Sequence, residues 1–104
     1  MDRGIDSILA EYAKQVYEAY NPKAVYLFGS YAKGEATKYS DIDVAVVLEN
    51  VDTAEYMEIY GQLWFIAAHV DGRIEPKLII DDGEYDRFSF LHEIKKTGRE
   101  IVLT

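Results

Sequence analysis

Two aspartates one residue apart, Asp41 and Asp43, stand at the start of a strongly apolar segment, Ile42–Leu48. Alternate residues of a β-strand point to one face, about 6.5–7 Å apart, so both carboxylates face the same way while Ile42 points into the core. Two ionised carboxylates this close repel each other unless a cation lies between them, and Mg²⁺ suits such oxygen ligands. Ser40, just before the pair, is expected to bond to the backbone of its turn. Alone, the pair fits an acidic turn better than a metal site.

A Gly-Ser pair, Gly29 and Ser30, follows the preceding apolar segment, Ala24–Phe28, and changes that balance. A glycine at a strand end lets the backbone turn sharply and lets a ligand approach where no Cβ stands in the way. The next residues, "SYAK", favour a helix whose first N–H groups, together with the Ser30 hydroxyl, would bind a phosphate. A phosphate cradle beside a pair of metal-binding acids supplies the two components that phosphoryl or nucleotidyl transfer needs.

The elements that must position these residues are predicted from the spacing of apolar side chains and from Pro and Gly. Helices are expected over residues 5–20, 53–70 and 85–96, and strands over 24–28, 42–48, 73–80 and, as a short last strand, 100–104. Pro76 cannot donate to a ladder, which places its strand at an edge of the sheet. This order predicts an α/β (α+β) fold, a small mixed sheet with helices packed on it, in one domain of residues 1–104.

The predicted helix over residues 53–70 is apolar over an unusually wide arc. Its neighbours Trp64 and Phe65 point about 100° apart, so one sheet cannot easily bury both. One explanation is a helix that is covered on two sides within the domain. The other is a rim of Tyr60, Trp64 and nearby apolar residues that contacts another chain.

Composition narrows the classes of partner. A net charge of −8 argues against a surface that grips nucleic acid non-specifically, because phosphate neutralisation needs clustered Lys and Arg. Cysteine is absent, which excludes disulfides and thiolate zinc sites. The N-terminal "MDRGID" lacks the pattern of a signal peptide, and the longest apolar run, Leu63–Ala68, is too short to span a bilayer. We therefore expect a cytoplasmic protein with no membrane contact and no direct nucleic-acid binding.

The segment Val25–Val47, which contains "GSYAKGEATKYSDIDVAVV", resembles the motif of the DNA polymerase β-type nucleotidyltransferase superfamily. The short chain is similar to its minimal nucleotidyltransferase (MNT) branch. The resemblance implies the palm fold of that superfamily, with ATP as substrate and two Mg²⁺ ions bound by Asp41, Asp43 and a third carboxylate. It also implies that Gly29 and Ser30 hold the triphosphate, and that Lys33, where the family often has a basic residue, assists them.

The third carboxylate that the resemblance implies has two candidates. Glu75 is an acid embedded in an apolar strand, "RIEPKLII", where an unpaired charge otherwise has no explanation. Asp71 is the alternative, but it fits the turn "VDGR" better. We favour Glu75, although the family more often has Asp, whose shorter side chain would place a second metal ion differently. If Glu75 is no ligand, catalysis is in doubt while nucleotide binding survives.

The same resemblance suggests the acceptor. Minimal domains of this branch are commonly paired with a helical HEPN protein and act as the antitoxin, adding AMP to a tyrosine of that partner. The expected assembly is a hetero-oligomer with such a protein or a homodimer. Two other functions stay open: a transferase acting on a small molecule such as an aminoglycoside, and a non-catalytic module that neutralises its partner by contact alone.

Overall fold

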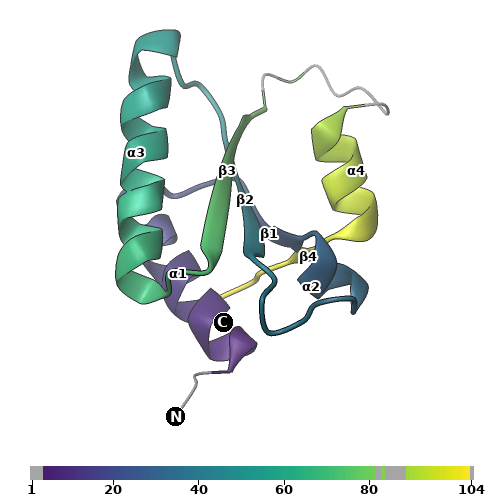
Figure 1. Ribbon diagram of the computed structural model, residues 1–104. Helices are drawn as coiled ribbons and strands as arrows, with labels where there is room; N and C mark the ends of the chain where they lie inside the picture. Colours follow the sequence, from purple (N-terminus) through teal and green to yellow (C-terminus); the bar gives the residue numbers. More distant parts are fainter. Residues whose placement is uncertain (1–3, 82, 84–88, 104) are drawn as a thin grey trace.

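Helices and strands alternate along residues 4–81, 83 and 89–103, the part of the chain that the computed structural model describes (Figure 1). The predicted bounds of the first five elements are confirmed to within a residue, and a short helix follows the Gly-Ser pair. The elements are α1 (Ile5–Tyr20), β1 (Ala24–Phe28), α2 (Ser30–Lys33), β2 (Ile42–Leu48), α3 (Thr53–Val70), β3 (Ile74–Ile80), α4 (Phe90–Thr97) and β4 (Arg99–Glu100).

The strands form one mixed sheet in the order β3-β2-β1-β4, which confirms the predicted fold class. β1 runs antiparallel to both β2 and β4, whereas β2 and β3 are parallel and joined by the crossover helix α3. A parallel pair needs such a long connection, because a tight turn can only reverse the chain. β3 lies at an edge, as Pro76 predicts.

The sheet has one fully covered face and one partly covered face. α1 and α3 lie against the first face, and α4 lies on the other side (Figure 1). The Tyr12 hydroxyl ties the two covering helices together by donating to the Leu63 carbonyl at 3.0 Å. The covered face holds the main core, which includes Ile8, Leu9, Tyr12, Val16, Val25, Leu27, Ile42, Val44, Val46 and Leu78. The face under α4 holds a smaller cluster of Ala24, Tyr26, Ala45, Val47, Leu91 and Ile94.

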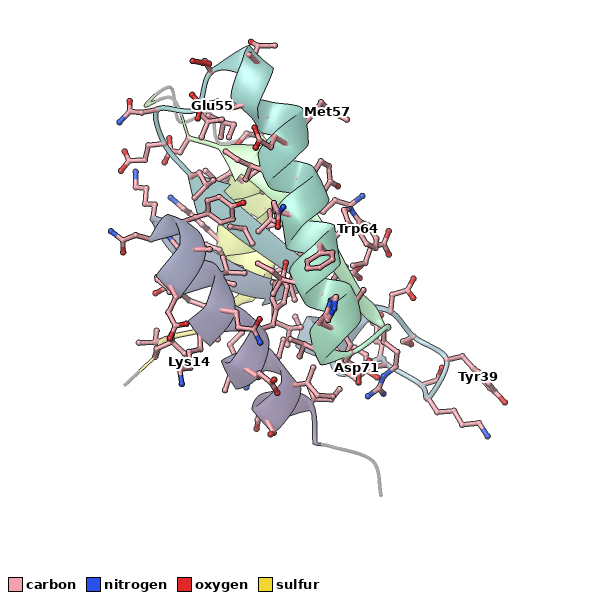
Figure 2. All side chains as sticks on the ribbon, turned by 90° about the vertical axis from the view of Figure 1, so that its left-hand side faces the viewer. Lys14, Tyr39, Glu55, Met57, Trp64 and Asp71 are labelled. Carbon is pink, nitrogen blue, oxygen red and sulfur yellow. The ribbon has the colours of Figure 1, made fainter. Side chains whose placement is uncertain are left out.

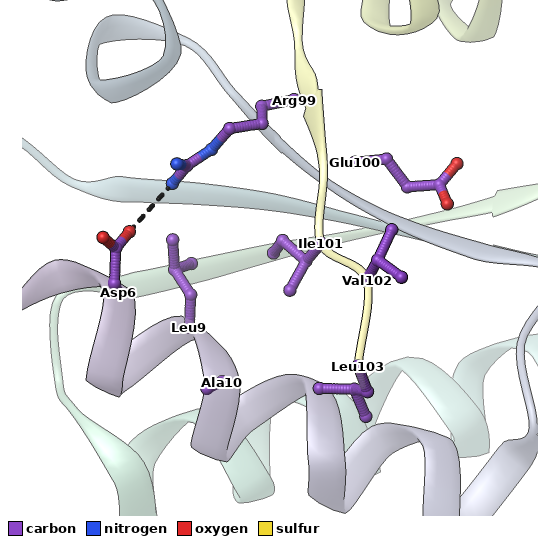
Figure 3. Close-up of a pocket in the computed structure, with 8 residues that line it drawn as sticks. All are labelled: Asp6, Leu9, Ala10, Arg99, Glu100, Ile101, Val102 and Leu103. Atoms are coloured by element: carbon purple, nitrogen blue, oxygen red, sulfur yellow. Dashed lines mark hydrogen bonds and ion pairs between the residues drawn. The ribbon is translucent and has the colours of Figure 1, made fainter.

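The C-terminal elements differ from the predicted ones. α4 begins at Phe90, because Ser89 is extended and its side chain accepts a hydrogen bond from the His92 N–H; the predicted start at residue 85 lies outside the described residues. The last strand covers Arg99 and Glu100 and not residues 100–104, although the Ile101 N–H still donates to the Val25 carbonyl of β1 at 2.8 Å. Residues 101–103 run beside α1 instead, next to an ion pair between Arg99 and Asp6 (Figure 3).

No described helix has both the length and the apolarity that a membrane span requires.

Candidate active site

The two aspartates lie at the start of β2 and face away from the main core. Ile42 between them is fully buried against α1 and α3, whereas Asp43 is half-buried on the opposite face of the sheet and Asp41 is exposed. The alternation expected from a β-strand therefore holds. The turn before them is held by Ser40, whose Oγ accepts from the Thr37 N–H at 2.8 Å and whose own N–H donates to the Thr37 carbonyl at 3.0 Å. This local role of Ser40 is the predicted one.

The sheet register brings the predicted acids together from different strands. Asp43 is opposite Phe28 of β1 and opposite Glu75 of β3, so the side chains of all three lie in one row on the α4 face. The Glu75 carboxyl group also lies close enough to Asp41 and Asp43 to be affected by both of them. Asp41, Asp43 and Glu75 thus form a carboxylate cluster at one end of the sheet.

Burial and mutual repulsion both act on this carboxylate cluster. Partial burial raises the pKa of Asp43, and the negative charge of Asp41 raises it further. Partial burial also raises the pKa of Glu75. The interaction of its carboxyl group with Asp41 and the negative charges of both aspartates raise this pKa further. Each shift means that positive charge nearby compensates the ionised form only in part. A bound cation would supply that charge.

Gly29 lies directly beneath the Asp43 side chain. Its backbone has φ +73° and ψ −151°, a conformation essentially restricted to glycine. A Cβ at this position would overlap the Asp43 Oδ2 atom and lie 3.1 Å from its Cγ. Gly29, which the sequence predicts to admit a ligand, therefore also leaves room for the carboxylate of Asp43, a predicted metal ligand.

The other predicted nucleotide-binding residues lie on α2, which packs against the ends of β1 and β2. Ser30 is half-buried at the first position of this four-residue helix, immediately after Gly29. Lys33 is exposed at its last position. The structure thus places Ser30 beside the carboxylate cluster, and Lys33 one helical turn further out.

Asp71, the alternative third acid, is engaged elsewhere. Its carboxylate accepts from the Arg73 guanidinium at 3.0 and 3.1 Å and from the Arg73 backbone N–H at 2.9 Å. Such a two-pronged pair fixes the geometry of a carboxylate strongly. Asp71 therefore belongs to the turn before β3, which leaves Glu75 as the acid that lies in register with Asp43.

Lys77 is a neighbour that the sequence reasoning missed. It follows Glu75 by two residues on β3, so both side chains share a face, and its charge lowers the pKa of Asp43 and of Glu75 against the larger opposing effects. The sequence pattern that could have identified Lys77 is Glu-Pro-Lys, because it places an acid and a base two residues apart on one strand. Lys77 places a positive charge beside the carboxylate cluster.

The donor set suits Mg²⁺ together with a phosphate. Among the described residues, no three His, Asp or Glu side chains form a ready-made cage for a metal ion. Mg²⁺ needs no such cage, because it usually binds one or two carboxylates and takes its remaining ligands from water and substrate phosphate. The carboxylates of Asp41, Asp43 and Glu75 and the open backbone at Gly29 therefore fit a metal–triphosphate group.

Comparison with known proteins identifies the family. Residues 11–104 match the family described as "Polymerase beta, Nucleotidyltransferase". Protein adenylyltransferase MntA of Thermococcus cleftensis is 34% identical over 61 residues, which cover 52% of this chain and 62% of that protein. "Putative protein adenylyltransferase MJ1215" of Methanocaldococcus jannaschii is 39% identical over 56 residues, which cover 54% of this chain and 63% of that protein. The matched segments thus span less than two thirds of these relatives.

A solved structure supports the fold independently. The crystal structure of "a putative nucleotidyltransferase from Sulfolobus solfataricus" matches 97% of this chain and 88% of that chain with a TM-score of 0.58. The sequence identity is 16%, so this likeness concerns the fold alone. With the family match over nearly the whole chain, it leads to one conclusion: the chain belongs to the polymerase β nucleotidyltransferase family.

Proposed function

We propose that this chain transfers AMP from ATP to a hydroxyl group, using Mg²⁺ bound at Asp41, Asp43 and Glu75. The observation that carries the proposal is the contact between Gly29 and Asp43, since it joins the phosphate-binding turn to the metal-binding acids. An acidic surface turn has no need of a glycine-only conformation beneath a half-buried carboxylate. A site for a metal-bound triphosphate requires that close approach.

The chain's residues would act by position and charge. Gly29 and Ser30 would hold the β- and γ-phosphates, and Lys33 on α2 and Lys77 on β3 would add positive charge beside them. Bound Mg²⁺ would lower the pKa of the acceptor hydroxyl and neutralise the leaving pyrophosphate. Asp41, Asp43 and Glu75 would fix the two reacting groups in line, so the acceleration comes from orientation and electrostatics without a covalent enzyme intermediate.

The acceptor we propose is a tyrosine hydroxyl of a HEPN-domain protein, so that the chain acts as the antitoxin of a pair. The relatives named above as protein adenylyltransferases support a protein acceptor.

The test is AMP transfer from labelled ATP with Mg²⁺ to the product of the neighbouring gene, the candidate for the proposed HEPN-domain partner. Asp43→Asn and Glu75→Gln should each abolish labelling of the partner. Asp71→Asn is the matched control, because it neutralises a nearby acid that pairs with Arg73, and it should retain labelling. Loss with Asp71→Asn but not with Glu75→Gln would reverse the assignment of the third acid. Tight binding of the two proteins without any transfer would contradict the enzymatic function.

A further inference from the structure

One side of α3 presents apolar side chains to solvent along its whole length. Within the described residues only Leu63 and Ala67 of this 18-residue helix are fully buried. Met57, Trp64 and Phe65 are 72%, 44% and 60% exposed, and Figure 2 shows Met57 and Trp64 on the side of α3 that faces away from the sheet. These three side chains share an exposed stripe with Ala54, Gly61 and Ala68, which together we call the outer face of α3.

A hollow continues this face at the N-terminal end of the helix. Its volume is about 440 Å³, and its apolar lining comes from Val51, Tyr56, Met57 and Ile80, with Asp52 and Thr53 at its side. A hollow lined mainly by apolar side chains can receive an apolar side chain from outside. The outer face of α3 therefore combines projecting apolar side chains with a hollow that can accept an apolar side chain, and both features are typical of a packed protein interface.

The adjacent edge strand restricts how a partner can bind. An exposed sheet edge usually offers carbonyl and N–H groups to an added strand. Here the Tyr60 hydroxyl donates to the Pro76 carbonyl and the Tyr56 hydroxyl donates to the Leu78 carbonyl, both at 3.1 Å. Pro76 also has no N–H to offer. A partner at this side must therefore bind through side chains on α3, not by extending the sheet.

Charge indicates the chemistry of that partner. Asp52, Glu55 and Glu58 lie at and beside the N-terminal half of the face. The negative charge of Asp52, and a hydrogen bond between the two carboxyl groups, raise the pKa of Glu55, so these acids already repel each other. A second copy of a chain with net charge −8 would add to this repulsion. Lysine or arginine side chains would relieve it.

We propose that the outer face of α3 is a docking surface for a protein that presents an apolar side-chain cluster bordered by Lys or Arg. The inference rests on the proposed function in taking the HEPN-domain protein as that partner. It adds that docking and chemistry use different faces of the sheet, because α3 covers one face and the carboxylate cluster lies on the other. The partner would bind to α3, and its acceptor hydroxyl would extend past the end of the sheet to the carboxylate cluster.

The test uses Trp64, the chain's single tryptophan, as its own reporter. Titration with the product of the neighbouring gene, the candidate for the proposed HEPN-domain partner, should shift the Trp64 emission as the indole leaves water. If the partner itself contains tryptophan, 5-fluorotryptophan in this chain isolates the signal by ¹⁹F resonance. Calorimetry then compares variants. Buried aromatic anchors dominate interfaces, so Trp64→Lys should weaken binding by about 30-fold or more. Ala19→Lys adds the same charge at an exposed position of α1 and should bind like the wild type.

The outcomes separate this inference from the proposed function. Asp43→Asn should bind the HEPN protein normally yet transfer no AMP, whereas Trp64→Lys should retain Mg-ATP binding while losing the partner. Equal partner affinity for Trp64→Lys and wild type would overturn the docking surface and leave the proposed function standing. Self-association in sedimentation equilibrium that Trp64→Lys abolishes would also overturn it, in favour of a second copy. No binding of the wild type to the HEPN protein would remove both this assignment and the proposed partner.

Discussion

Replacing Gly29 by alanine tests the centre of the site, since this residue carries the contact with Asp43. Gly34 offers a matched control, because it also has φ +73° but a Cβ there would meet no atom within 4 Å. Gly34→Ala therefore carries only the backbone strain of a left-handed residue, whereas Gly29→Ala carries backbone strain and a clash with the carboxylate.

The two strains differ in size. Alanine in the glycine-only region that Gly29 occupies costs on the order of 1–3 kcal/mol, with relief of the clash added to it. Alanine in the left-handed helical conformation of Gly34, with ψ 19°, costs about 1 kcal/mol. Each kcal/mol lowers the Tm of a domain this size by about 4–8 °C. The Asp43 carboxylate must also move off its position, and a displacement of about 1 Å can reduce a transfer rate about 100-fold.

The measurements are thermal unfolding followed by circular dichroism, Mg-ATP affinity by calorimetry, and AMP transfer by radiolabel. We expect Gly29→Ala to unfold at a lower temperature than Gly34→Ala and to lose transfer about 100-fold, while Gly34→Ala keeps it. If the two variants melt alike and Gly29→Ala retains wild-type transfer, the Gly29–Asp43 contact does not position the site, and the reasoning behind the proposed function fails.

Two further predictions concern the fold that supports the site. Tyr12→Phe should lower the free energy of unfolding by about 0.5–1.5 kcal/mol in denaturant titrations, because the buried hydrogen bond from the Tyr12 hydroxyl to the Leu63 carbonyl is lost while that carbonyl keeps its bond within α3. An unchanged free energy of unfolding would mean that this hydrogen bond contributes nothing net. The pKa of Asp81 lies below its usual 3.8, mainly because its carboxylate accepts a hydrogen bond from Lys23. The contribution of Asp81 to the free energy of unfolding is therefore present above pH 3.8 and is lost as the pH falls through the lowered pKa. Asp81→Asn should therefore melt below wild type at pH 7 and approach it in strong acid, and a Tm difference that is independent of pH would contradict this assignment.

The secondary structure was accessible from the sequence because local signals agreed. Pro22 and an Asn21 with left-handed backbone end α1 where the pattern stops, and Gly98 ends α4 where a Cβ would lie 2.6 Å from the Ile94 carbonyl oxygen. Pro76 correctly placed β3 at an edge. The last strand was overestimated, because the chain leaves the sheet after the Ile101 N–H has bonded to Val25, and Val102 and Leu103 are exposed.

The site was only partly accessible, because its geometry depends on non-local pairing. The sequence could name Asp41 and Asp43 from their spacing and Glu75 from its apolar surroundings. It could not show that Glu75 lies opposite Asp43, since that register depends on how the whole of α3 packs between two parallel strands. It likewise could not show Gly29 beneath Asp43, since that contact depends on the β1–β2 register, which pairs Phe28 with Asp43. The spacing of residues along a strand predicts which side chains share a face, but the tertiary packing determines which strand lies beside it and in what register.

The two faces of the sheet differ in packing, and this difference explains how so small a domain can hold a cluster of acids that repel each other. No polar or charged residue among those described is buried, so apolar packing is the main source of stability on the face under α1 and α3, with the Tyr12–Leu63 hydrogen bond added to it. The other face can then carry acids that repel each other, because Ile42 anchors the start of β2 between Asp41 and Asp43 from the opposite side. Removing a cation from these acids would therefore raise their mutual repulsion without disturbing the core. Under the proposed function, that separation would let ligand binding act on the carboxylate cluster while α3 stays available for a partner.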